Sequence, residues 1–120
     1  MAQRLAFVGT GIMGEPMAGH LLRGGHAVVV HNRTRGKAAA LLAAGASWAD
    51  SPAAAARGAD VVFVCVTDTP DVRRVLLERG GVIDAARAGL VVVDHSTISP
   101  SATRDIAAAL ADGGVTLLDA

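Results

Sequence analysis

Residues 5–14 read Leu5-Ala6-Phe7-Val8-Gly9-Thr10-Gly11-Ile12-Met13-Gly14, and this stretch decides the fold. The continuous apolar run at 5–8 is typical of a strand buried on both faces of a parallel sheet. Three glycines follow in the spacing Gly-X-Gly-X-X-Gly, and residues 12–23 then have the length and composition of a helix. A second apolar run at 27–30 closes a strand–helix–strand unit of about thirty residues, the setting in which this glycine pattern is specific.

Each glycine of the pattern has a steric role. Gly9 permits a tight turn out of the strand, Gly11 lets the main chain approach a pyrophosphate, and Gly14 lets helix and strand pack closely. The unpaired amides and the positive dipole end of the helix then face the anion. The alternative is a tight turn that binds no ligand, with Met13 simply packing. The predicted cofactor contacts here are Gly9, Thr10, Gly11, Ile12, Met13 and Gly14.

The rest of the chain repeats the alternation of apolar runs and alanine-rich helical stretches. Apolar runs occur at 61–66, 90–93 and 115–118, with a weaker candidate at 46–49. Helical stretches occur at 36–44, 52–57, 70–77 and 100–112, several of them opened by Ser-Pro or Thr-Pro and followed by glycine. This order predicts a doubly wound α/β fold: a mainly parallel, six-stranded sheet with helices on both faces.

Composition narrows the function. The 120 residues suit one domain. Because 11 basic residues balance 11 acidic ones, the chain has no net positive charge that would attract nucleic acid or an anionic membrane. The apolar runs are far shorter than the roughly 20 residues of a membrane helix. A lone cysteine, Cys65, and four histidines without ligand spacing indicate no metal site. We expect a cytoplasmic protein in which Cys65 is an inert core residue.

The segment after the second strand predicts the coenzyme. An NAD-binding domain carries Asp or Glu about twenty residues beyond the glycines, where it accepts a hydrogen bond from the ribose 2′-hydroxyl. Here the segment 31–37, HNRTRGK, has three cations and no acid. Arg33 can direct two N–H groups onto a 2′-phosphate, and Asn32 and Thr34 can add hydrogen bonds. We predict NADP(H), with NAD(H) less favoured; the alternative is a solvated basic turn in which Thr34 caps the next helix.

Ligands of doubly wound sheets bind beyond the carboxyl ends of the strands, near the switch in strand order. Val66 ends the fourth strand, which flanks this switch, and Thr67 follows it; we predict that both border the cofactor. Ser96 and Thr97 follow the next strand, where their hydroxyls can hold a nicotinamide carboxamide or a substrate carboxylate. Turn formation ahead of the next helix explains these two residues equally well.

His95 stands beside Asp94, but we expect no acid–base pair between them. Neighbouring residues on a strand point to opposite faces of the sheet, so His95 is interpreted as a loop histidine.

Three stretches resemble the β-hydroxyacid dehydrogenase family, which includes 3-hydroxyisobutyrate dehydrogenase, tartronate semialdehyde reductase and the glyoxylate and succinic semialdehyde reductases. The cofactor domain of 6-phosphogluconate dehydrogenase is a relative. The stretches are residues 7–18, FVGTGIMGEPMA; Gly25-His26 with Asn32-Arg33-Thr34; and residues 94–100, DHSTISP. Together the first and last favour this family over the similar imine reductases.

The resemblance implies a Rossmann domain over residues 1–120 that serves hydride transfer between NADP(H) and a small 3-hydroxyacid or semialdehyde. Thr97 would contact cofactor or substrate. Such enzymes continue into a helical substrate and dimerisation domain with an acid–base lysine, whereas the only lysine here is Lys37, on the adenosine side. We therefore expect no catalytic residue in this chain, NADPH binding without turnover, and a homo-oligomeric full-length enzyme.

Two other functions share the glycine-rich turn. A non-catalytic NADP(H)-sensing module would have every cofactor feature described above. An S-adenosylmethionine methyltransferase needs an acid at the end of the second strand, and Asn32-Arg33 argues against it.

Overall fold

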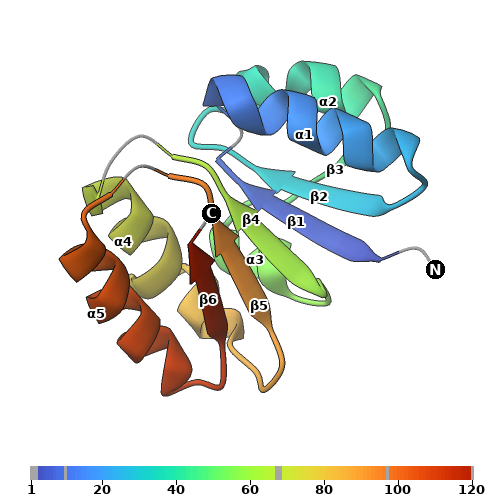
Figure 1. Cartoon of the computed structure of the whole chain (residues 1–120). Coiled ribbons are helices and arrows are strands. Elements are labelled where there is room, and N and C mark those ends of the chain that lie inside the picture. Colours follow the sequence, from blue (N-terminus) through green and yellow to red (C-terminus); the bar gives the residue numbers. More distant parts are fainter. Residues whose placement is uncertain (1–2, 10, 67–68, 97, 120) are drawn as a thin grey trace.

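The computed structural model describes residues 3–9, 11–66, 69–96 and 98–119. Strands and helices alternate through this part of the chain (Figure 1). The strands are β1 (Arg4–Val8), β2 (Ala27–His31), β3 (Ser47–Trp48), β4 (Val61–Val64), β5 (Val91–Asp94) and β6 (Thr116–Asp119). The helices are α1 (Gly11–Arg23), α2 (Ala39–Ala43), α3 (Pro52–Ala56), α4 (Thr69–Leu77) and α5 (Pro100–Ala111), with 3-10 turns η1 (Arg35–Ala38) and η2 (Val82–Ala85).

The strands form one six-stranded sheet in the order β3-β2-β1-β4-β5-β6, and every neighbouring pair is parallel. β1 lies between β2 and β4, so the chain changes direction across the sheet at β1. Figure 1 shows α1 and α2 over one face, and α4 and α5 over the other. The predicted doubly wound α/β fold is confirmed, and the switch in strand order falls where the sequence predicted it.

The period of two along each strand divides the apolar core between the two faces. On β1, Phe7 packs in the cluster beneath α1 and α2, whereas Ala6 and Val8 pack in the larger cluster beneath α3, α4 and α5. All three side chains are fully buried. Because both faces of the central strand are covered, its sequence is continuously apolar.

Most predicted element ends are confirmed by local hydrogen bonds and dihedral angles. The Oγ atoms of Ser51 and Ser99 accept from the N–H groups of Ala54 and Ala102, at 3.0 and 3.2 Å, and so cap α3 and α5. Glycines after four helical stretches have positive φ, as a left-handed C-terminal turn requires. They are Gly25, Gly45, Gly58 and Gly114.

Several predicted boundaries differ from the structure by one or a few residues, and one short element was not predicted. The strand expected at 61–66 ends at Val64, because the N–H of Val66 donates to the side chain of Ser96 instead of a strand carbonyl. The helix expected at 36–44 begins as the 3-10 turn η1, the helix expected from Pro70 begins at Thr69, and η2 was not predicted.

Candidate functional site

The turn after β1 can be formed only by glycine. Gly9 has a φ of +75°, and its N–H donates to the carbonyl oxygen of His31 over 2.8 Å. A Cβ atom at this position would lie 2.3 Å from Cγ1 of Val66 and 2.7 Å from the carbonyl oxygen of Cys65. Both the backbone conformation and the lack of space therefore exclude a side chain. This confirms the tight turn predicted at Gly9.

α1 begins at Gly11, directly after this turn, so the glycine pattern spans the end of a buried strand and the first turn of a helix. The first amides of a helix have no partner within it, and they point out from its N-terminus. Thr10 lies outside the described residues. The contacts predicted for Gly11, Ile12, Met13 and Gly14 stay predictions.

The three residues after β2 differ in exposure. Asn32 is buried, while Arg33 and Thr34 are exposed. Thr34 has an extended backbone at the start of η1, but its side chain makes no capping hydrogen bond. Thr34 thus occupies the N-cap position named in the alternative, without the side-chain hydrogen bond, and the solvated basic turn stays an alternative to phosphate recognition. Arg33 and Thr34 face solvent beyond the end of β2, where they are accessible to a ligand.

An acidic residue lies beside Arg33, although none occurs in the sequence segment around it. Nη2 of Arg33 is 3.0 Å from Oδ1 of Asp71, which lies in the first turn of α4. Asp71 follows Pro70 in the first turn of α4, where an acidic residue is common, and it was not among the predicted site residues. Since 38 residues separate the pair in sequence, no local pattern indicated the contact.

A chain of hydrogen bonds connects the carboxyl ends of β4 and β5. The buried carboxylate of Asp94 accepts from the N–H of Ser96 over 2.8 Å, and Oγ of Ser96 accepts from the N–H of Val66 over 2.9 Å. Val66 is the residue that a Cβ at Gly9 would strike. Ser96 thus has the turn-forming role that the sequence left open, and its contact with a substrate stays a prediction. Thr67 and Thr97 lie outside the described residues.

His95 and Asp94 contact different neighbours, as predicted. The imidazole of His95 stacks on the ring of Phe63, with a centroid distance of 6.0 Å, while Asp94 accepts from Ser96. Cys65 corrects a prediction: it follows the last residue of β4 and is partly exposed, so it is not a core residue.

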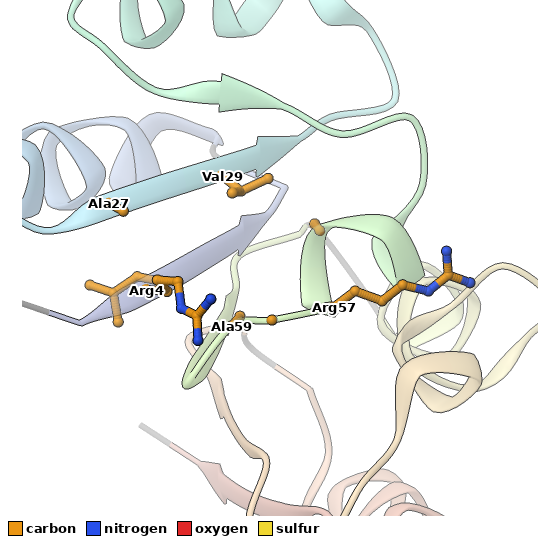
Figure 2. Close-up of a pocket in the computed structure, with 8 residues that line it drawn as sticks. Arg4, Ala27, Val29, Arg57 and Ala59 are labelled. Atoms are coloured by element: carbon orange, nitrogen blue, oxygen red, sulfur yellow. The ribbon is translucent and has the colours of Figure 1, made fainter.

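A pocket lies at the opposite edge of the sheet, where the strands begin (Figure 2). Its lining residues are Arg4, Leu5, Ala27, Val29, Ala55, Arg57, Gly58 and Ala59. Figure 2 shows the guanidinium groups of Arg4 and Arg57 pointing in different directions, so they do not converge on one ligand. Ligands of doubly wound sheets bind at the other edge, which carries Gly9, Arg33 and Ser96.

In the described ranges, His, Cys, Asp and Glu side chains form no group of three that could hold a metal ion. The helices in the same ranges all fall short of the length and apolarity needed to cross a bilayer.

Comparison with known proteins assigns the chain to a family. The model of the NAD binding domain of 6-phosphogluconate dehydrogenase matches residues 4–120. The chain belongs to this family. It is an NAD(P)-binding domain of the hydroxyacid dehydrogenase type, as the resemblance in the sequence implied.

Two relatives of this NAD(P)-binding domain carry the name of an oxidoreductase or a dehydrogenase. An uncharacterized oxidoreductase of Shewanella frigidimarina is 44% identical over 118 residues, which are 98% of this chain and 40% of the relative. The probable 3-hydroxyisobutyrate dehydrogenase-like 1, mitochondrial, of Arabidopsis thaliana is 45% identical over 107 residues, which are 88% of this chain and 32% of the relative. The chain thus spans well under half the length of these relatives.

Solved structures of similar proteins have the same fold. A 3-hydroxyisobutyrate dehydrogenase of Mycobacterium tuberculosis, solved with L-serine, matches with a TM-score of 0.90 at 32% identity, covering 99% of this chain and 40% of that chain. Psf3, in complex with NADP+ and 2-OPP, matches with a TM-score of 0.88 at 36% identity, covering 94% of this chain and 40% of that chain.

Proposed function

We propose that this chain is the NADP(H)-binding domain of an oxidoreductase that transfers hydride between NADP(H) and a small 3-hydroxyacid or semialdehyde. The observation that carries the proposal is the turn at Gly9. It lies at the carboxyl end of β1, at the switch in strand order, where both the φ of +75° and the packing against Val66 and Cys65 exclude a side chain. A bare main chain at this place fits a pyrophosphate.

The residues around this turn have distinct roles in the proposal. Gly9 forms the tight turn, with its own N–H donating to His31, and Gly14 lets the helix pack closely on the strand. The main chain of Thr10, Gly11, Ile12 and Met13 presents donors to the pyrophosphate. Arg33, which is exposed, donates to the 2′-phosphate, assisted by Thr34, while Asn32 is buried at the base of the loop. Val66, Thr67 and Thr97 border the nicotinamide half. NADP(H), when bound, supplies the hydride acceptor or donor.

The proposal includes a preference for NADP(H) over NAD(H), and both coenzymes occur among the relatives. Psf3 was solved with NADP+. In contrast, a relative from Pseudomonas aeruginosa, 37% identical over 118 residues, is named NAD-dependent L-serine dehydrogenase. The exposed guanidinium of Arg33 after β2 is the feature of this chain that favours the 2′-phosphate.

The substrate and the proton transfer belong to the proposal for the whole enzyme. Ser96 and Thr97 follow β5 at the edge that carries Gly9, so we assign them to the substrate end of the crevice. Ser96 can still donate its hydroxyl proton, because its oxygen acts as an acceptor toward Val66. We assign no proton-transferring residue to residues 1–120; that role fits a lysine of a helical domain, as in the resembling enzymes.

Coenzyme titration tests the proposal. The increase in NADPH fluorescence on binding should give a saturable curve for this chain, with a lower Kd than NADH under the same conditions. S-Adenosylmethionine is the control ligand, and it should not compete with NADPH. A chain that binds neither dinucleotide would contradict the proposed function, and a lower Kd for NADH would contradict the proposed preference.

A further inference from the structure

The ion pair between Arg33 and Asp71 crosses the candidate coenzyme crevice. Arg33 follows β2, and Asp71 lies in the helix after β4; these are the two strands that pair with β1. The 3.0 Å contact therefore joins the loops on either side of the strand that leads into Gly9. A dinucleotide bound at this place would bring its adenosine ribose close to Arg33, the residue that is paired with Asp71.

Asp71 is positioned to keep its negative charge. Its Oδ1 atom also lies 3.6 Å from Nη2 of Arg74, one turn further along α4. A carboxylate in the first turn of a helix is stabilised by the unpaired N–H groups and the dipole of the helix. The side chain of Asp71 is 24% exposed, against 70% for Arg33. The carboxylate is thus the more fixed member of the pair, and the guanidinium is the more accessible one.

The two side chains favour different coenzymes. A 2′-phosphate carries a charge of about −1.5 to −2 and three strong acceptors, so it is attracted by Arg33 and repelled by Asp71. A ribose 2′-hydroxyl is neutral, and it readily donates a hydrogen bond to a carboxylate. The segment 31–37 favours NADP(H) because it contains no acid, but the fold places Asp71 beside Arg33.

We propose that Asp71 sets the coenzyme selectivity of this site: it competes with the 2′-phosphate for Arg33 and thereby lowers the preference for NADP(H) over NAD(H). This inference rests on the proposed function, because it requires a dinucleotide in the crevice. It adds a residue from α4 to a selectivity that the sequence assigned to the loop after β2 alone.

The test is the variant Asp71→Asn, which removes the charge and keeps the shape. We expect the Kd for NADPH to fall about two- to fivefold at low salt, within the range of exposed charge pairs. The Kd for NADH should stay constant or rise, so that the ratio of the two changes in favour of NADPH. At high salt the effect should shrink, because exposed charges are screened.

Two further variants make the test specific. Asp105→Asn removes another exposed carboxylate that is paired with an arginine, Arg73, at 3.5 Å, and it should leave both Kd values unchanged. In an Arg33→Ala background, Asp71→Asn should change the NADPH Kd by less than about twofold, because the competition requires the guanidinium. Asp71→Ser serves as a second variant, should the asparagine protein have an altered circular dichroism spectrum.

The outcomes separate the two proposals. If the unmodified chain binds NADPH but Asp71→Asn and Asp71→Ser leave the ratio of the Kd values unchanged, the inference is overturned and the proposed function stands. The inference is also overturned if Asp71→Asn lowers the NADPH Kd by the same factor in the Arg33→Ala background. Asp71 would then repel the phosphate directly, without competing for Arg33. If the unmodified chain binds neither coenzyme, both proposals fail.

Discussion

At the scale of the single residue, Gly9 has the strictest requirement in the described part of the site. Two separate costs apply to any side chain here: a left-handed backbone conformation and a collision with Val66 and the carbonyl group of Cys65. The first costs roughly 1–2 kcal/mol and the second about 1–3 kcal/mol. The turn that exposes the main chain to a ligand therefore cannot tolerate even one methyl group.

The variant Gly9→Ala tests this directly. We expect it to lower the free energy of unfolding by about 2–5 kcal/mol, the sum of the two costs, and to abolish NADPH binding. The matched control is Gly25→Ala, which has a φ of +88° but no atom within 4 Å of its Cβ position. Gly25→Ala should lose only the stability that the left-handed backbone conformation costs, and it should bind NADPH normally. Thermal unfolding measures the stability of both variants, and fluorescence titration measures their NADPH binding. Equal effects of the two variants would contradict the steric argument.

Arg33 is the second residue whose role can be isolated. Removing its guanidinium in Arg33→Ala should raise the Kd for NADPH about ten- to hundredfold, because a hydrogen bond to a charged group contributes roughly 1.5–3 kcal/mol. The Kd for NADH should change little. Arg57→Ala, at the opposite edge of the sheet, is the control and should change neither value. Equal losses for NADPH and NADH in Arg33→Ala would refute recognition of the 2′-phosphate.

At the scale of the elements, the loops after β4 and β5 support each other. Ser96 connects them through its hydroxyl, which accepts from Val66, while its own N–H is held by Asp94. Val66 in turn packs against the backbone at Gly9. The geometry of the β1 turn thus depends on a residue that follows β5, two strands away in the sheet.

Ser96→Ala should therefore lower stability as well as coenzyme affinity. Removal of the hydroxyl leaves the part-buried N–H of Val66 without its acceptor, at a cost of about 1–3 kcal/mol in the free energy of unfolding. Ser96→Thr, which retains the hydroxyl, should recover most of the loss. Chemical denaturation and NADPH titration measure the two effects. An unchanged unfolding free energy in Ser96→Ala would indicate that the serine acts only toward a substrate.

At the scale of the whole molecule, the parallel sheet aligns all strand ends, and this alignment creates the site. The turn at Gly9, the loop of Arg33 and the Ser96 turn come from three strands whose carboxyl ends lie at one edge (Figure 1). The two apolar clusters hold the helices against the faces of the sheet and leave this edge to the loops. The stability of the core thus maintains the alignment of the site.

Two aliphatic side chains, Ile106 and Leu118, differ in how far they are buried. Ile106 of α5 is fully buried in the larger cluster, whereas Leu118 of β6 is 51% exposed. Ile106→Ala should lower the free energy of unfolding by about 2–5 kcal/mol through lost burial and a cavity. Leu118→Ala should cost much less, since little apolar surface is lost from the core. Urea denaturation of both variants measures the difference; equal costs would contradict the assigned burial.

Local patterns were sufficient for the strands and the α-helices of this fold, though not for η2. The Ser-Pro pairs at 51–52 and 99–100, the glycines with positive φ and the continuous apolar runs all act through neighbours in the chain. For the same reason, the glycine turn and the exposed arginine after β2 were predictable parts of the site. The boundary of β4 was not, because Val66 leaves the strand for a side-chain acceptor 30 residues away.

The amino-acid sequence by itself determined the order of strands and helices, the place of the glycine turn and the family, since these depend on short-range sterics, capping and periodic burial. Only the tertiary structure decided which side chains from different loops meet. It brought Asp71 to Arg33 and Ser96 to Val66, across separations of 38 and 30 residues. Such contacts depend on how strand ends align in the assembled open sheet, and no local pattern of residues encodes that alignment.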